Sequence, residues 1–448
     1  MLRNMKLFAA MTLAGVVFFL LLNKNYELPR ADQATSQSNE FLRVSENGRY
    51  FVRNGKPFFW LGDAVWSLAV LYTKEEAGVY LEHRRQQGFN VFQVMLAFNG
   101  GPGIKTGANN QEGELPWLNS NPATPNEAYF KNVDYLIDLA RQKGVLLYLL
   151  PLGGSGGSFV DKDKVFTKEN VRAYGLWLGR RYKDVPNIIW MNGFDLRPSQ
   201  YVDIVDELAT GLREGDGGSH LMSYAPGGGF SSSYFHNKPW LSFNHIQTWS
   251  DYWRAHPMVV ADYCLTPAKP VVMAEGAYEE GPEYPSRPIT PLVVRKEAYW
   301  SYLGGGFHCF GHNDMWRHNP TWRQSLDSPG ARQMGVLKSI LTSRQWWKLV
   351  PDQSVFRFGA GSDKTLNVAA RSTDGDTAIV YLSSPTTIAI DMNKITAGKT
   401  LRATWINPAT GEQTAIGEFP TRGFHSFATP DTSEDAVLTL DAVTPDQP

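Results

Sequence analysis

The sequence is poor in cysteine and has no excess of charge of either sign. Its 448 residues include two cysteines, Cys264 and Cys309, too few for a disulfide scaffold or a four-cysteine zinc site. The two could pair in an oxidising compartment, but two buried thiols are the favoured arrangement. The 43 Lys and Arg residues nearly balance the 44 Asp and Glu residues, for a net charge of −1. Because nucleic-acid binders normally carry a basic surface, this balance argues against a nucleic-acid partner.

Phosphate-binding glycine motifs and metal-ligand clusters are also missing. No GxGxxG or GxxxxGK[ST] sequence opens any expected helix, which argues against a nucleotide cofactor. The glycine-rich segment at residues 153–157 lacks a following Lys-Ser/Thr, so we interpret it as a mobile substrate lid. His308, Cys309 and His312 are not accompanied by another ligand at a suitable spacing. We therefore expect no cofactor and no metal.

Long apolar runs are absent except for one at the N-terminus. Residues 7–22 contain no charged residue and follow Arg3 and Lys6, a pattern typical of an export signal with positive charge retained inside. The run is short for a bilayer-spanning helix, yet no good small-x-small cleavage site follows it. An uncleaved signal-anchor is therefore favoured over a cleaved signal peptide. Either one predicts an exported protein, at the periplasmic or extracellular face, with residues 1–39 as targeting segment and polar tether.

The body of the chain alternates short apolar runs with longer helical patterns. This alternation predicts an α/β protein with a (β/α)8 TIM barrel at residues 40–348, whose active site lies at the carboxyl ends of the strands. An open doubly wound sheet is the alternative, and the missing nucleotide motif disfavours it. The expected strands are residues 57–64, 90–97, 145–152, 187–194, 219–226, 241–248, 270–278 and 306–312, and the expected helices are 73–87, 126–143, 167–182, 199–213 and 291–303.

The sequence pattern changes after about residue 349. Short strands follow one another without a long helical pattern, and turn sequences such as Asp374–Asp376 separate them. A small antiparallel β-sandwich is therefore predicted for residues 349–448, joined to the barrel by a helical stretch at 330–347. Its expected strands are residues 365–371, 377–383, 400–406 and 436–440.

Carboxylates stand at the ends of two strands that face each other across a barrel. Asp195 ends the fourth expected strand and Glu275 ends the seventh. A single carboxylate at such a position is often a helix cap, whereas a facing pair can flank one sugar. Glycoside hydrolysis needs such a pair, because one carboxyl protonates the leaving oxygen while the other attacks the sugar or activates water. The pattern therefore predicts a glycoside hydrolase with Asp195 and Glu275 as catalytic residues.

Other residues near the strand ends are candidates for substrate contact. The aromatic ones could stack on sugar rings or pack at the barrel rim, and the polar ones could bind hydroxyl groups. If Asp195 is not the acid, Asp63 and Asp314 are the alternatives. The candidates for substrate contact are Asp63, Trp66, Asn192, His245, Gln247, Trp249, Tyr278, His312, Asn313 and Trp316.

Several of these segments together resemble glycoside hydrolase family 140, the apiosidase-like group. The resemblance extends from about residue 41 to residue 440, and it implies a (β/α)8 hydrolase with an Asp acid/base at Asp195 and a Glu nucleophile at Glu275. The segment Trp405–Glu412 resembles the β-domain assigned in that group as a collagen-binding module, although nothing in it argues for collagen. The segments that carry the resemblance to the barrel are Asn54–Asp63, Trp190–Asp195, Met273–Glu275, Tyr299–Ser301 and Gly311–Asn313.

These patterns predict an exported, membrane-tethered, retaining glycoside hydrolase that acts as a monomer on a polysaccharide or complex glycan. An inverting hydrolase or a lyase on the same scaffold is the nearest alternative enzyme. A non-catalytic surface protein that binds glycans on a degenerate barrel is the alternative of another class. It would have lost one carboxylate of the pair, whereas both are present. The sugar, the linkage and endo or exo action stay open.

Overall fold

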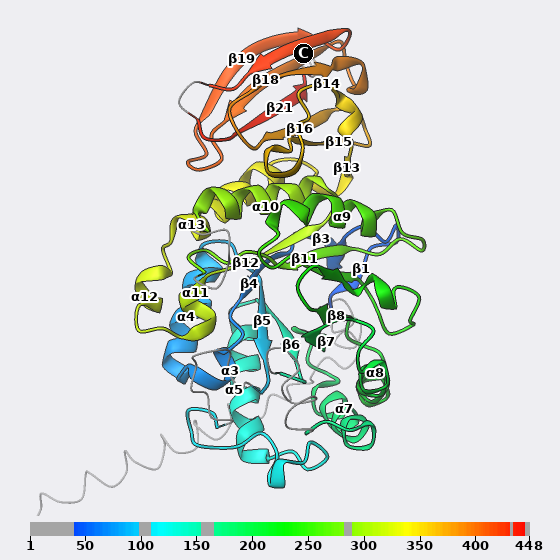
Figure 1. Ribbon diagram of the computed structural model, residues 1–448, viewed down its shortest axis with the longest axis vertical. Helices are drawn as coiled ribbons and strands as arrows, with labels where there is room; N and C mark the ends of the chain where they lie inside the picture. Colours follow the sequence, from blue (N-terminus) through cyan, green and yellow to red (C-terminus); the bar gives the residue numbers. More distant parts are fainter. Residues whose placement is uncertain (1–39, 98–108, 154–164, 282–288, 431–432, 444–448) are drawn as a thin grey trace, which may run out of the picture. The chain divides into compact units, whose positions relative to one another are not determined.

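The computed structural model describes residues 40–97, 109–153, 165–281, 289–430 and 433–443, which Figure 1 shows coloured along the chain. Two expected features, the apolar segment at residues 7–22 and most of the glycine-rich segment at 153–157, lie outside these residues. In the part of the chain that is described, no helix combines the length and apolar character needed to cross a membrane.

Eight parallel strands among the described residues form a barrel. In chain order they are β4 (Leu61–Ala64), β5 (Val91–Met95), β6 (Leu146–Leu150), β7 (Ile188–Leu196), β8 (Met222–Pro226), β10 (Asn244–Gln247), β11 (Val271–Glu275) and β12 (Phe307–Gly311). The first and last strands pair with each other. The ring closes between β8 and β10, where the backbone N–H of Ser242 donates to the carbonyl of Met222 at 2.7 Å. The predicted (β/α)8 fold is therefore confirmed, and all eight carboxyl ends lie at one face of the barrel.

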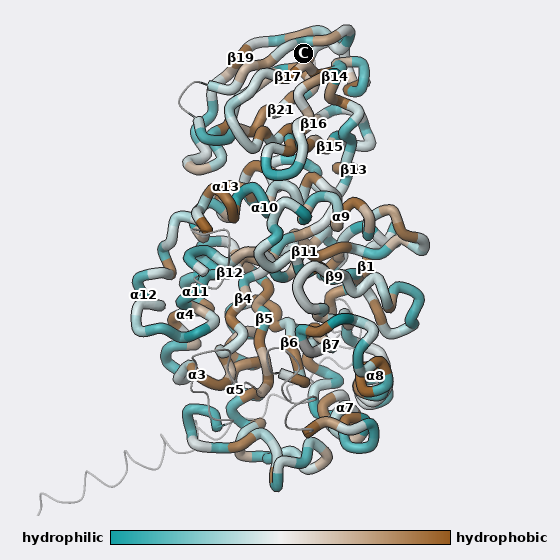
Figure 2. Tube along the Cα trace, viewed as in Figure 1, coloured by the Kyte–Doolittle hydropathy of each residue, from teal (hydrophilic) through white to brown (hydrophobic). Residues whose placement is uncertain are grey.

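Helices surround the barrel, and Figure 2 shows apolar residues concentrated in central strands such as β4 and β5. The main helices are α4 (Lys74–Gln86), α5 (Glu127–Gln142), α7 (Lys168–Tyr182), α8 (Val202–Asp216), α9 (Ala255–Tyr263), α10 (Pro291–Leu303) and α13 (Pro329–Thr342), and the short ones are α3 (Leu68–Leu71), α11 (Asn313–Arg317) and α12 (Trp322–Ser325). Helices α4 and α7 begin with capping boxes at Thr73 and Thr167. The sequence did not predict α9, because it is short and Pro257 lies inside it.

A small hairpin sheet covers the amino ends of the barrel strands. It consists of β1 (Arg43–Val44), β2 (Phe51–Arg53) and β3 (Lys56–Phe58). The buried ring of Phe51 lies 5.1 Å from Trp60, 5.3 Å from Phe243 and 5.4 Å from Phe307, between ring centres. The expected first strand at 57–64 is therefore two strands, one in the hairpin and one in the barrel.

The C-terminal part forms two antiparallel sheets, as expected, with an apolar core of their own that includes Val380, Ile390 and Leu438. The prediction missed several strands, of which β19 is the clearest case, because seven of its eight residues are exposed and it lacks an apolar face. One sheet has the order β13 (Leu349–Pro351), β15 (Val368–Ser372), β16 (Thr377–Leu382), β21 (Ala436–Ala442), β18 (Thr400–Ile406) and β19 (Gln413–Pro420), and the other has β14 (Phe356–Phe358), β17 (Thr387–Asp391) and β20 (Phe424–Ala428).

A buried ion pair joins the C-terminal sheets to helix α10. The Arg295 guanidinium binds both carboxylate oxygens of Asp435, at 2.7 and 3.0 Å. Tyr381 donates to the same carboxylate at 2.8 Å, and its ring stacks on Tyr299 with 4.4 Å between the ring centres. Charges buried in this way fix one geometry, because either partner alone would be left unpaired in the interior.

The two cysteines are free thiols. Cys309 is buried on β12, where the indole N–H of Trp60 donates to its sulfur at 3.4 Å. Cys264 follows α9 and is exposed. The expectation of two unpaired thiols is confirmed, whereas the expected burial of Cys264 is wrong.

Candidate active site

Asp195 lies at a distortion at the carboxyl end of β7. Its φ is 56°, in the left-handed region, and that of Gly193 is 111°. The register between β7 and β8 shifts between Gly193 and Leu196, as at a β-bulge. Asp195 is partly exposed there, whereas Met191 and Asn192 before it are buried. Strained backbone of this kind is concentrated at functional sites, where it directs a side chain.

Glu275 is the last residue of β11 and the only one of its five residues that is not buried. Its neighbour across the parallel ladder is Gln247 on β10, after a register shift between Ile246 and Gln247. Thr248 donates its backbone N–H to the carbonyl of Glu275 at 2.9 Å. The strand end that carries Glu275 is therefore held against the loop that follows β10.

A run of three glycines connects the ends of β7 and β10. Gly227 donates to the carbonyl of Leu196 and Gly229 donates to that of Gln247, both at 2.8 Å. A Cβ atom on Gly227 would lie 3.1 Å from the carbonyl oxygen of Asp195. Through this loop and Gln247, the ends that carry Asp195 and Glu275 form one continuous rim. These glycines are not among the residues predicted from the sequence, although their run directly after a strand was an available signal.

Trp249 differs from the other aromatic candidates because its ring is exposed. Its side chain is 40% exposed and its φ is 50°. Trp66 and Tyr278 are buried, and the indole N–H of Trp66 donates to the Tyr278 hydroxyl at 2.7 Å. Trp316 is half-buried, with the Arg317 guanidinium 4.1 Å from its ring centre. Of these four candidates, Trp249 offers the most open face for stacking on a sugar.

Gln247 and His245 both point into the barrel, but at different depths. Gln247 is buried next to Glu275 in the ladder, and its Oε1 has no hydrogen-bond partner among the described residues. His245 lies deeper, with Nδ1 3.0 Å from the Tyr148 hydroxyl. Burial lowers the pKa of His245 to about 3, so the ring is neutral. Gln247 is therefore the better placed of the two to contact a ligand.

Two of the predicted substrate contacts point away from the barrel interior. Asp63 is fully buried, and its Oδ2 lies 2.8 Å from Nε of Arg84 on α4. Asn192 is also fully buried and donates from Nδ2 to the carbonyl of Val205 on α8 at 2.8 Å. Both side chains attach strands to helices. This geometry differs from the predicted substrate contact, and the burial of Asp63 disfavours it as an alternative acid.

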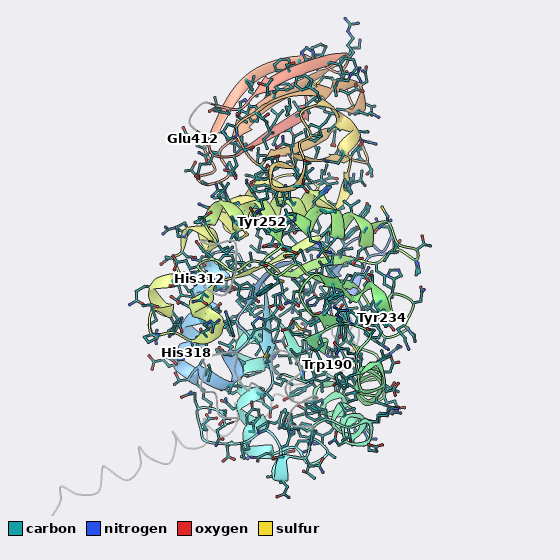
Figure 3. The ribbon with its side chains drawn as sticks, viewed as in Figure 1. Trp190, Tyr234, Tyr252, His312, His318 and Glu412 are labelled. Atoms are coloured by element: carbon teal, nitrogen blue, oxygen red, sulfur yellow. The ribbon has the colours of Figure 1, made fainter. Side chains whose placement is uncertain are left out.

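The residues after β12 are held within their own loop. His312, labelled in Figure 3, is buried and caps α11, accepting at Nδ1 from the backbone N–H of Asp314. Burial lowers the pKa of His312 to about 4. Asn313 accepts from Nε of Arg317 at 2.9 Å. Burial alone would raise the pKa of Asp314, but hydrogen bonds from Asn319, Ser325 and Thr321 hold it below its ordinary value, which disfavours Asp314 as the acid.

A buried carboxyl group that was not predicted from the sequence packs against this rim. Glu297 on α10 lies 2.7 Å from the Thr248 hydroxyl and accepts from the backbone N–H of Ala277 at 3.2 Å. Burial raises the pKa of Glu297 to about 8, so the carboxyl carries its proton at neutral pH. Glu297 thus joins the loops that follow β10 and β11. An acidic residue within a helix gave no signal, because most such residues face solvent.

In the described ranges, no group of three or more His, Cys, Asp or Glu residues is arranged to hold a metal ion. The side chains at the rim are instead partly exposed carboxylates, one exposed indole and an amide. Such a set can protonate, attack and stack on a polyhydroxylated ligand.

Comparison with known proteins gives matches over most of the chain. The family described as "Apiosidase-like, catalytic domain" matches residues 45–348, and "Putative collagen-binding domain of a collagenase" matches residues 350–441. A solved structure described as a glycoside hydrolase is 30% identical, with TM-score 0.80, over 92% of this chain and 99% of its own. A family 5 glycoside hydrolase from Bacteroides vulgatus is also 30% identical, with TM-score 0.81, over 92% and 95%. Comparison with curated proteins gives no match.

Proposed function

Since this chain belongs to the apiosidase-like family of glycoside hydrolases, we propose that it cleaves a glycan with retention of configuration, using Asp195 as acid/base and Glu275 as nucleophile. The observation that carries the proposal is the single rim on which these two partly exposed carboxylates stand, joined by the loop Gly227–Gly229. Asp63 is fully buried, and the hydrogen bonds that hold the pKa of Asp314 below its ordinary value disfavour Asp314 as the acid. Asp195 and Glu275 are therefore the pair suited to the chemistry.

The proposed reaction has two steps. Asp195 protonates the glycosidic oxygen while Glu275 attacks the anomeric carbon, so that the leaving group departs and a glycosyl-enzyme forms. Asp195, now ionised, then removes a proton from water, which attacks the same carbon and releases Glu275. Trp249 stacks on the apolar face of a sugar ring, and the Oε1 of Gln247 accepts a hydrogen bond from a hydroxyl beside Glu275.

The proposed location of this reaction is outside the cytoplasm. Residues 7–22 support this, because they form an uncharged segment after Arg3 and Lys6. Export places the enzyme at the periplasmic or extracellular face, where polysaccharides and complex glycans are accessible, and the same segment tethers a monomer to the membrane.

The proposed function is tested by substrate and by variant. The wild type is incubated with a panel of furanoside- and uronate-containing glycans and the released sugars are identified. On the glycan that is cleaved, Glu275→Gln is expected to lower turnover by several orders of magnitude while the fold is kept. Near-normal turnover in that variant would remove Glu275 from the mechanism.

A further inference from the structure

A groove lies where the C-terminal part meets the loop between β10 and α9. Its volume is about 350 Å³, and it is lined by Trp253, Ser362, Asp363, Lys364 and Thr365. Trp253 belongs to the short helix η4 (Tyr252–Arg254) of the barrel, and three of the others form the short helix η7 (Asp363–Thr365) of the C-terminal part. Tyr252, labelled in Figure 3, is the first residue of η4. Both parts of the chain therefore contribute to the groove.

The groove is held in shape before any ligand arrives. The indole N–H of Trp300 on α10 donates to the carbonyl of Leu366 at 2.9 Å, and Lys296 donates to the carbonyl of Lys364 at 3.2 Å. Tyr252 stacks on Trp300, with ring planes 6° apart and 6.1 Å between centres. These contacts fix the loop of the C-terminal part against α10. Binding of a ligand therefore requires little further ordering of the site, which would otherwise reduce the affinity.

The same loop carries both this groove and the proposed active-site rim. It begins at Thr248, which binds the carbonyl of Glu275, and includes Trp249 and Trp253. Trp253 lies four positions after Trp249, so the chain between them spans at most about 14 Å. A ligand longer than one sugar can therefore extend from the rim toward the groove.

The groove's chemistry suits a sugar ring. Lys364 holds its ammonium over the half-buried indole of Trp253, 4.5 Å from the ring centre. A sugar that stacks on this face takes the place of the ammonium, which can then bind the hydroxyl groups of the sugar. Asp363, with φ of 49°, adds a carboxylate, and Ser362 and Thr365 add hydroxyl groups. One cation and one anion leave no net charge, which favours a polyhydroxylated ligand over a strongly charged one. The volume lies at the lower end of that of known ligand sites.

We propose that this groove binds a sugar of the glycan substrate remote from the bond that is cleaved, so that the C-terminal part takes part in substrate binding. The proposal rests on the proposed function, because it assigns the groove to the same glycan chain. It gives Trp253 the role of stacking platform and Lys364 and Asp363 the role of hydroxyl partners.

The test compares Trp253→Ala and Lys364→Ala with Phe424→Ala, a control that removes a side chain 56% exposed on β20. For each, kcat/KM is measured on a long oligosaccharide from the cleaved glycan and on the aryl glycoside of its terminal sugar. We expect the first two variants to lose about tenfold in kcat/KM on the oligosaccharide, through KM, and to keep wild-type values on the aryl glycoside. Phe424→Ala should match the wild type on both.

Unchanged kinetics on the oligosaccharide, or equal losses on both substrates, would overturn the proposal. A second measurement tests binding in the groove independently of cleavage. It is affinity gel electrophoresis of the same variants with the polysaccharides of the panel. Weaker retention of Trp253→Ala than of Phe424→Ala supports the groove even if the wild type cleaves none of them. Equal retention of the two variants overturns it.

Discussion

The carboxyl group of Glu297 lies directly against Gly276, the residue after the proposed nucleophile. A Cβ atom on Gly276 would stand 2.1 Å from Oε2 of Glu297, closer than any real contact. The same carboxyl group binds Thr248 and Ala277. A side chain at position 276 therefore requires the Glu297 carboxyl group or the backbone to move, and Glu297 contacts the chain on both sides of the rim.

The first prediction follows from this close fit. Gly276→Ala forces the Glu297 carboxyl or the backbone after Glu275 to move, which displaces the nucleophile. We expect a loss of about 1–3 kcal/mol of stability and a fall in kcat larger than the change in KM. Urea denaturation and steady-state kinetics measure the two effects. Gly78→Ala on α4 is the control, because a Cβ there meets nothing within 4 Å and its φ is not positive, so no stability should be lost. Wild-type kcat in Gly276→Ala would contradict the account.

The second prediction concerns the raised pKa of Glu297. Its ordinary value is 4.5 and its value in the fold is about 8, so the native state holds a proton that the unfolded chain releases between these limits. The stability from this group is fully present below pH 4.5 and is lost as pH rises toward 8, by up to about 1.4 kcal/mol per pH unit. Glu297→Gln mimics the protonated form, so its stability relative to the wild type should rise over that range.

Denaturant unfolding of the wild type and Glu297→Gln at a series of pH values measures this difference. Glu297→Gln should also retain most activity, whereas Glu297→Ala should lose it, because only the amide can replace the contacts to Thr248 and Ala277. A stability difference that is flat with pH would show that Glu297 is ionised in the fold.

The third prediction separates a buried ion pair from a substrate contact. Asp63→Asn leaves the Arg84 guanidinium buried without its carboxylate, which should cost about 3–5 kcal/mol of stability. The folded fraction should keep the kcat and KM of the wild type, because the Asp63 side chain is fully buried against Arg84 and cannot touch the substrate directly. A large rise in KM with unchanged stability would instead restore the sequence-based assignment of Asp63 to substrate binding.

The sequence predicted the barrel well, because each parallel strand is a short, mostly apolar run between helical patterns. It could not tell which face a strand-end residue occupies. Parallel strands in a barrel are apolar on both faces, so they lack the alternation that distinguishes inside from outside. Asp63 and Asn192 therefore share the strand-end pattern of Asp195, yet their side chains bind helices α4 and α8. Asp195 follows the bulge at Gly193 and is partly exposed.

Contacts between segments far apart in the sequence were also beyond prediction. Glu297 looked like an ordinary helix-surface acid, and its burial depends on Gly276, which leaves space for its carboxyl group. The groove between Trp253 and Lys364 unites residues more than one hundred positions apart. Local patterns carry no information about such pairs, because they form only when separate segments of the chain pack together.

The assignment of Asp195 as acid/base and Glu275 as nucleophile is tested most directly by azide rescue on an activated aryl glycoside, with the product's anomeric configuration read by NMR. In Asp195→Ala, azide should attack the glycosyl-enzyme without general-base help, restore turnover and yield a glycosyl azide of the same configuration as the substrate. In Glu275→Ala, azide should take the place of the nucleophile and yield the opposite configuration. The reverse pattern, or no rescue in either variant, would contradict the assignment.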